Sequence, residues 1–186
     1  MEADFSVELG SDDERLEVPW AAPDGSCQYF DLSSHPDLIT RIEEAQREPV
    51  LAGLLLRMNS RDGALRSAKC DVWSTSEINP EEEIFGLPVK YCSYVDLLFA
   101  GERRLSFPAN EQLAKQWTQL LRKAPELPAS AEFLIRRCRF HEEAGEEDGF
   151  YITAYVFGFG DDEQSARQQW QIGLQLLENA IRQCAR

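Results

Sequence analysis

The chain has 186 residues, an ordinary apolar share of 43%, and 33 acidic residues against 19 basic ones. The resulting formal charge of −14 argues against nucleic acid and anionic membranes as partners, because both are bound mainly through clustered cations. No stretch approaches the roughly 20 apolar residues of a membrane span, and the N-terminus lacks the cationic and apolar parts of a signal peptide, so a cytoplasmic location is expected.

The N-terminal part of the chain is polar and acidic. Residues 1–17 contain little apolar material and are expected to form an acidic flexible tail, which leaves 18–186 as a single α+β domain. A short apolar run at 27–32 follows a turn and is a candidate strand. Apolar residues then recur at helical spacing from 36 to 59, and Pro49 predicts a break at Arg47-Glu48 because proline removes a helical hydrogen bond.

Strand and helix patterns alternate through the rest of the chain. The expected strands are 67–76, 89–99, a short segment at 104–107, 132–140 and 150–159. Acidic loops separate the members of each long pair, at 77–88 and 142–149. A second helix is expected from Pro108 to Lys123. The final helix, with an apolar stripe from Ala166 to Cys184, begins at a cap formed by Asp161 or Asp162.

This order, (β)-α-β-β-β-α-β-β-α, predicts a mainly antiparallel sheet of about five strands with three helices packed on one face. The sequence also contains a weak internal repeat. A helix, a Ser-Ala pair and a hairpin with an acidic loop recur with an offset of 63 residues from Ser67 to Ser130. A duplication would place a twofold cleft at the centre of the molecule. Chance similarity of two helix–hairpin units is the alternative.

The sheet face turned away from the helices is the candidate functional surface. Alternate residues of the long strands place aromatic and charged side chains together, a mixture too polar for a core and too aromatic for plain surface. Cross-strand pairs such as Trp73 with Tyr94, or Lys69 with Asp96, would also stabilise an exposed sheet with no ligand. The candidate ligand-binding residues are Lys69, Asp71, Trp73, Tyr94, Asp96, Arg137 and Tyr155.

Motifs for cofactors, metals and nucleophilic catalysis are not found in the sequence. Gly158-Phe159-Gly160 lacks the third glycine of a dinucleotide turn, and the acidic loops lack the ligand spacing of a calcium loop. The five cysteines are scattered without a C-x-x-C pair, so neither a zinc site nor a disulfide framework is expected. No cofactor and no metal are therefore predicted.

One constellation suits acid–base chemistry. Asp71 and Asp96 share the candidate face, and neighbouring carboxylates can separate their pKa values and act as acid and base. The basic cluster Arg136, Arg137 and Arg139 could bind an anionic ligand, although internal ion pairs are the alternative. Catalytic residues are otherwise not identifiable.

These patterns favour a non-enzymatic module that binds a small molecule or a protein on the aromatic and polar sheet face. A small hydrolase or isomerase that uses Asp71 and Asp96 is the enzymatic alternative. The order α, β-β-β, α, β-β, α resembles that of small acidic dimeric secretion chaperones, a likeness of element order alone. This resemblance implies a third hypothesis, a homodimeric chaperone-like interaction protein.

Overall fold

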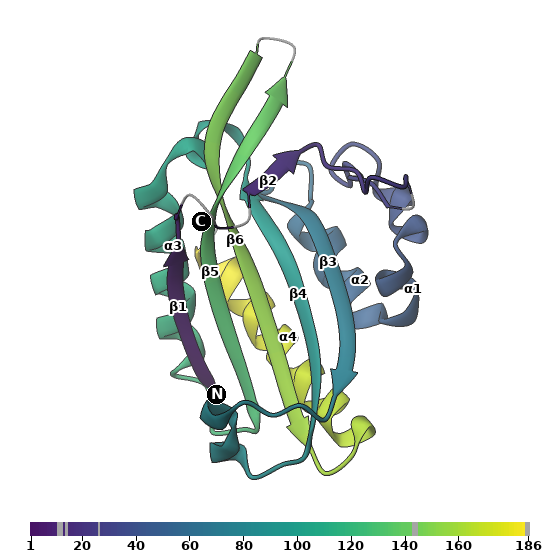
Figure 1. Ribbon diagram of the computed structural model, residues 1–186, viewed down its shortest axis with the longest axis vertical. Coiled ribbons are helices and arrows are strands. Elements are labelled where there is room, and N and C mark those ends of the chain that lie inside the picture. The colour runs from purple at the N-terminus through teal and green to yellow at the C-terminus, as the bar shows by residue number, and fades with distance from the viewer. Residues whose placement is uncertain (11–12, 14, 26, 143–144, 185–186) are drawn as a thin grey trace.

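A mixed sheet of six strands organises the residues that this computed structural model describes, which are 1–10, 13, 15–25, 27–142 and 145–184 (Figure 1). The strands are β1 (Glu2–Glu8), β2 (Arg15–Val18), β3 (Leu65–Thr75), β4 (Val89–Phe99), β5 (Ala129–Glu142) and β6 (Gly145–Gly160). The helices are α1 (Glu43–Arg47), α2 (Pro49–Met58), α3 (Phe107–Leu121) and α4 (Glu163–Cys184), with 3-10 segments η1 (Pro36–Arg41), η2 (Pro80–Phe85) and η3 (Gly101–Leu105). The predicted α+β class is confirmed.

Helices α2, α3 and α4 lie against one side of the sheet, as expected (Figure 1). We call this side the helical face and the opposite side the open face. The strand order is β1-β5-β6-β4-β3, with β2 also paired to β5. The four strands from β5 to β3 pair antiparallel, whereas β1 and β2 run parallel to β5, so the sheet is mixed rather than purely antiparallel.

The helix boundaries follow local chemistry. The predicted break is confirmed, because α1 ends at Arg47 and α2 begins at Pro49, where proline lacks only an N–H that the first helical turn leaves unpaired. Ser106 caps α3 by accepting a hydrogen bond from the Ala109 backbone. Asp162 caps α4 and accepts a hydrogen bond from the Ser165 backbone at 2.7 Å, which lowers the pKa of its carboxyl.

The expected acidic tail at 1–17 is wrong for the residues described there, because β1 and β2 belong to the sheet. Apolar and acidic residues alternate along β1. Ala3 and Phe5 pack into the core on the helical face, while Glu2, Asp4 and Glu8 alternate with them. Acidic composition masked this pattern, and a parallel pairing with β5 leaves no turn signal in the sequence. Residues 11, 12 and 14 lie outside the described part.

Three other predictions need correction. The run at 27–32 is not a strand, and only Gln28 there makes an isolated bridge, to Ala21. The segment 104–107 is not a strand either, since η3 leads directly into α3. The loop at 142–149 is mostly paired, because β5 and β6 continue through it as a projecting hairpin (Figure 1); residues 143 and 144 lie outside the described part.

The two helix–hairpin units are arranged around a local twofold axis. Asp71 pairs with Tyr94 in the first hairpin, and Glu132 pairs with Tyr155 in the second. Both members of the second pair lie 61 residues after those of the first, and Tyr94 pairs with Tyr155 where the hairpins meet. The registers therefore give an offset of 61 residues rather than 63. On the helical face α4 contacts both α2 and α3 and occupies the centre, the place where a duplication would have put a cleft.

The main core lies between the sheet and the helices. Trp117 of α3 and Trp170 of α4 are fully buried against strand residues such as Phe133. A smaller apolar cluster lies on the other side of the sheet, at the end near β2, and consists of Leu16, Val18, Leu98, Cys138, Phe140 and Tyr151. This cluster closes the open face at the end near β2 and leaves its middle accessible.

Candidate binding surface on the open face

Four aromatic rings in contact form a bent row in the middle of the open face, which crosses β3, β4 and β6 and then turns along β6. Trp73 and Tyr94 meet edge to face with ring centroids 6.4 Å apart, and Tyr94 and Tyr155 lie 5.7 Å apart. Tyr155 and Phe157 stack with centroids 5.9 Å apart and planes 5° from parallel. We call Trp73, Tyr94, Tyr155 and Phe157 the aromatic stripe. Each ring is partly exposed, so the stripe is presented to solvent.

The strand registers explain why these rings meet. Tyr155 and Phe157 are two residues apart on β6 and therefore point to the same side. Tyr94 pairs directly with Tyr155, and Cys92 of β4 pairs with both Trp73 and Phe157. The stripe thus combines residues from β3, β4 and β6, which are held in place by backbone hydrogen bonds rather than by loops.

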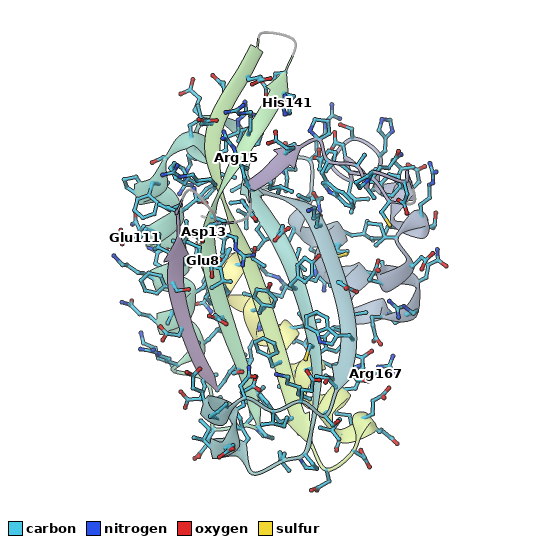
Figure 2. All side chains as sticks on the ribbon, viewed as in Figure 1. Glu8, Asp13, Arg15, Glu111, His141 and Arg167 are labelled. Atoms are coloured by element: carbon cyan, nitrogen blue, oxygen red, sulfur yellow. The ribbon has the colours of Figure 1, made fainter. Side chains whose placement is uncertain are left out.

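A buried polar network lies beside the stripe. Thr153, only 1% exposed, donates its hydroxyl proton to Asp96 at 2.7 Å and accepts a hydrogen bond from Arg136 at 3.3 Å. Arg136 also donates to Glu8 at 2.7 Å. Burial disfavours the charge on Arg136, but the hydrogen bond to Glu8, the charges of Tyr151 and Glu8 and a hydrogen bond to Tyr155 together outweigh it and raise the pKa of the guanidinium. The network links β1, β5, β6 and β4, and Glu8 marks its outer end in Figure 2.

Carboxylates flank the stripe on both sides. Asp71 lies opposite Tyr94 and Glu132 opposite Tyr155, and both carboxylates are exposed. Burial, followed by the charges of Asp96 and Asp71, raises the pKa of the Tyr94 hydroxyl. Burial likewise raises the pKa of Glu132, with further contributions from Glu8, Asp4 and Glu81 that outweigh the opposing Arg136. The stripe therefore lies between two exposed carboxylates.

The loop at 77–88 closes the end of the open face farthest from β2. Phe85 of η2 stacks on Phe159 with centroids 4.2 Å apart. Lys90 forms a 2.7 Å ion pair with Glu82 and lies 5.6 Å from the centre of the Phe157 ring. This segment, expected only as an acidic loop, is thus anchored and limits the length of the stripe.

The structure brings five of the seven candidate residues together, namely Asp71, Trp73, Tyr94, Asp96 and Tyr155. Lys69 lies beside a β-bulge between Ser67 and Cys70, where its ammonium is 5.2 Å from the Trp20 ring. Arg137 lies on the other face of the sheet, because residues alternate along β5, and Arg136 lies on the open face instead. A shift of one residue reverses the side of every residue in a strand, and no motif fixed this register.

Several residues of the surface were not among the seven candidates, although Arg136 was named as part of a basic cluster. Glu132, Arg136, Thr153 and Phe157 all belong to the open face. Their signal was the strict alternation of 130–136 and 151–157, which the apolar residues of the other face obscured. The expected contact of Trp73 with Tyr94 is present but diagonal, because Trp73 pairs with Cys92, and Asp71 pairs with Tyr94.

The two aspartates of the catalytic hypothesis are diagonal neighbours. Asp71 lies opposite Tyr94, and Asp96 is two residues further along β4 on the same side. Asp71 accepts a hydrogen bond from the Val72 backbone at 2.7 Å, whereas Asp96 is 5% exposed and accepts from Thr153. Asp96 is thus anchored within the sheet, a placement that suits a structural carboxylate better than a proton donor to substrate.

A cavity of about 500 Å³ lies outside the stripe, beside the bulge of β3. It is lined by Trp20, Phe30, Glu44 and Cys70, among others. Burial, followed by the charges of Glu44, Asp71 and Asp96, raises the pKa of the Cys70 thiol to about 12. The thiol therefore stays protonated at neutral pH and is a poor nucleophile.

Within the described residues, no group of three or more histidine, cysteine or acidic side chains is placed to hold a metal ion. None of the helices formed by those residues has the length and hydrophobicity to cross a bilayer. Comparison of the chain with protein-family models, curated proteins and solved structures gives no match.

Proposed function

We propose that this chain is a non-enzymatic binding module and that it holds its ligand or protein partner on the aromatic stripe. The observation that carries the proposal is the row of partly exposed rings, Trp73, Tyr94, Tyr155 and Phe157, at the centre of an ordered sheet. Tyrosine and tryptophan are enriched at binding surfaces because they offer large contact areas with few rotatable bonds.

The buried network supports the same proposal, because it limits the conformational entropy that is lost on binding. Thr153 and Arg136 link β4, β5 and β6 beside the rings. A partner would therefore meet side chains already held in one arrangement. Less conformational entropy is lost when a preorganised surface binds.

The proposal is tested with a Tyr94→Ser/Tyr155→Ser variant and a panel of basic, acidic and neutral synthetic peptides and small metabolites. Ile172→Ser is the matched control, because Ile172 is 48% exposed on α4, away from the stripe. We expect at least one probe to bind wild type and control alike and to bind the double variant at least tenfold more weakly. Equal binding to all three proteins, or no binding to wild type, would overturn the proposal.

A native mass spectrum at low and high protein concentration completes the test. Dimer formation that disappears in the Tyr94→Ser/Tyr155→Ser variant would identify a second copy of the chain as the partner of the stripe. A dimer that persists in the variant would place self-association on another surface and leave the stripe to other ligands.

A further inference from the structure

We infer that the aromatic stripe binds an extended basic polypeptide segment whose lysine or arginine side chains lie over its rings. This inference rests on the proposed function and specifies the partner of the same surface. Its grounds are a cation already seated on the stripe, the charges on either side, and the spacing of the rings.

The protein itself contains an example of the contact. The Lys90 ammonium lies 5.6 Å from the centre of the Phe157 ring and 2.7 Å from a Glu82 carboxylate oxygen. A cation held between a ring face and a carboxylate is a favourable arrangement, because both the ring quadrupole and the negative charge attract it. One end of the stripe therefore already holds a lysine side chain in this way.

The same pairing of ring and carboxylate recurs along the stripe. Tyr94 lies opposite Asp71, and Tyr155 lies opposite Glu132, in equivalent positions of the two hairpins. Both carboxylates are exposed and can reach a bound cation. Burial raises the pKa of Tyr94 and of Glu132, and neighbouring carboxylates add to both shifts. A basic partner complements this surface, whereas an acidic one is repelled.

The spacing of the rings favours a polypeptide over a small amine. Trp73, Tyr94 and Tyr155 lie on three adjacent strands with neighbouring centroids 6.4 and 5.7 Å apart, whereas Phe157 follows Tyr155 along β6. An extended chain advances about 3.3 Å per residue, so alternate side chains emerge about 6.6 Å apart on one side. Lysines or arginines at every second position therefore match the three rings that cross the strands, and Phe157 already holds Lys90. A small amine would contact only one or two of these rings.

The test is fluorescence anisotropy with a labelled peptide of alternating lysine and serine at physiological salt. Asp71→Asn/Glu132→Gln removes the flanking carboxylates, and Asp62→Asn/Glu111→Gln removes two carboxylates elsewhere, in a turn and on α3 at the left margin of Figure 2. Both variants change the net charge equally. We expect the first to weaken binding about tenfold and the second less than twofold.

Each other outcome has a definite meaning. Equal weakening by the two double variants would reduce the effect to net charge and overturn the inference. Equally tight binding of a peptide with its lysines in one block, or of free lysine, would overturn the extended segment. Preference for an acidic or neutral peptide that Tyr94→Ser/Tyr155→Ser abolishes would overturn the inference but keep the proposed function. Basic-peptide binding unaffected by Tyr94→Ser/Tyr155→Ser would overturn both.

Discussion

The helical and open faces of the sheet are built from alternate residues of the same strands, yet burial is completed differently on each. On the helical face Phe133 and Val156 are fully buried against helices. On the open face the buried residues include Asp96 and Thr153, which are joined by a hydrogen bond, and the rings above them stay partly exposed. Apolar packing secures one face, and hydrogen bonds order the other.

Because of this difference, the two faces should contribute differently to folding stability and to binding. The helical face is tightly fitted to α4 and tolerates little change, because close packing leaves no room for added atoms. The open face keeps large apolar side chains in contact with water, which contributes little to folding. Substitutions on the two faces should therefore have different consequences, and four predictions test this.

The largest effect is expected for Gly158→Ala on the helical face. A Cβ at this position would lie 2.1 Å from the Trp170 nitrogen and 2.3 Å from the Ala166 oxygen, both in the backbone of α4. The helix would have to move, so we expect a loss of about 4 kcal/mol or more in the free energy of unfolding, measured with urea. Gly53→Ala is the control, because its Cβ would meet only the flexible Arg57 side chain. Wild-type stability of Gly158→Ala would show that α4 is not seated on β6 as described.

Thr153→Val tests the polar network of the open face. The change keeps the shape of the side chain but removes the donor to Asp96 and the acceptor for Arg136. Hydrogen bonds to charged groups make the larger contributions, so we expect a loss of about 2 kcal/mol in urea unfolding. Thr40→Val, at an exposed hydroxyl that donates to the Asp37 carbonyl, should cost less than about 1 kcal/mol. An unchanged or higher free energy of unfolding for Thr153→Val would mean that hydrogen bonds do not order the open face, and that the two faces are stabilised in the same way.

The folding stability at alkaline pH should depend on Tyr91, which lies on the helical face. Its hydroxyl donates to the buried Glu48 carboxylate at 2.5 Å, and burial, together with this carboxylate, raises the pKa of Tyr91 to about 12 from an ordinary 10.0. The unfolded chain releases this proton first, so stability present below about pH 10 falls as the pH rises towards 12. Urea midpoints between pH 9 and 11 should fall less steeply for Tyr91→Phe. Part of the pH dependence should remain in this variant, because the pKa of Tyr94 is also raised.

Local chemistry made much of this architecture predictable. Pro49 marked the break between α1 and α2, the pair Asp161-Asp162 marked the start of α4, and the alternation of β4 placed Tyr94 and Asp96 on one face. Each of these features depends on residues close in sequence. The open face could therefore be anticipated, together with five of its side chains.

Long-range pairing accounts for what could not be predicted. β1 pairs in parallel with a strand more than 120 residues away, and no turn links the two strands. The register of β5 decided between Arg136 and Arg137, and it depends on contacts with both neighbouring strands. The network from Glu8 to Asp96 needs both pairings at once, so sequence alone could not reveal it.

The smallest effect on stability is expected at the stripe, and two tryptophans provide the comparison. Trp170 on the helical face is fully buried and donates to the Ser93 hydroxyl at 2.8 Å, so Trp170→Ala should cost about 3–5 kcal/mol. Trp73 is partly exposed on an edge strand, and its edge contact with Tyr94 is worth about 1 kcal/mol, so Trp73→Ala should cost little more than that.

Urea unfolding of both alanine variants decides the matter. A cost for Trp73→Ala close to that for Trp170→Ala would make the stripe a second core and remove the reason to propose a binding surface there. A small cost would leave a large aromatic side chain that the fold does not need, and selection for stability would not explain its position. Peptide binding by the Trp73→Ala variant, weakened while its fold is intact, would then give that side chain its role.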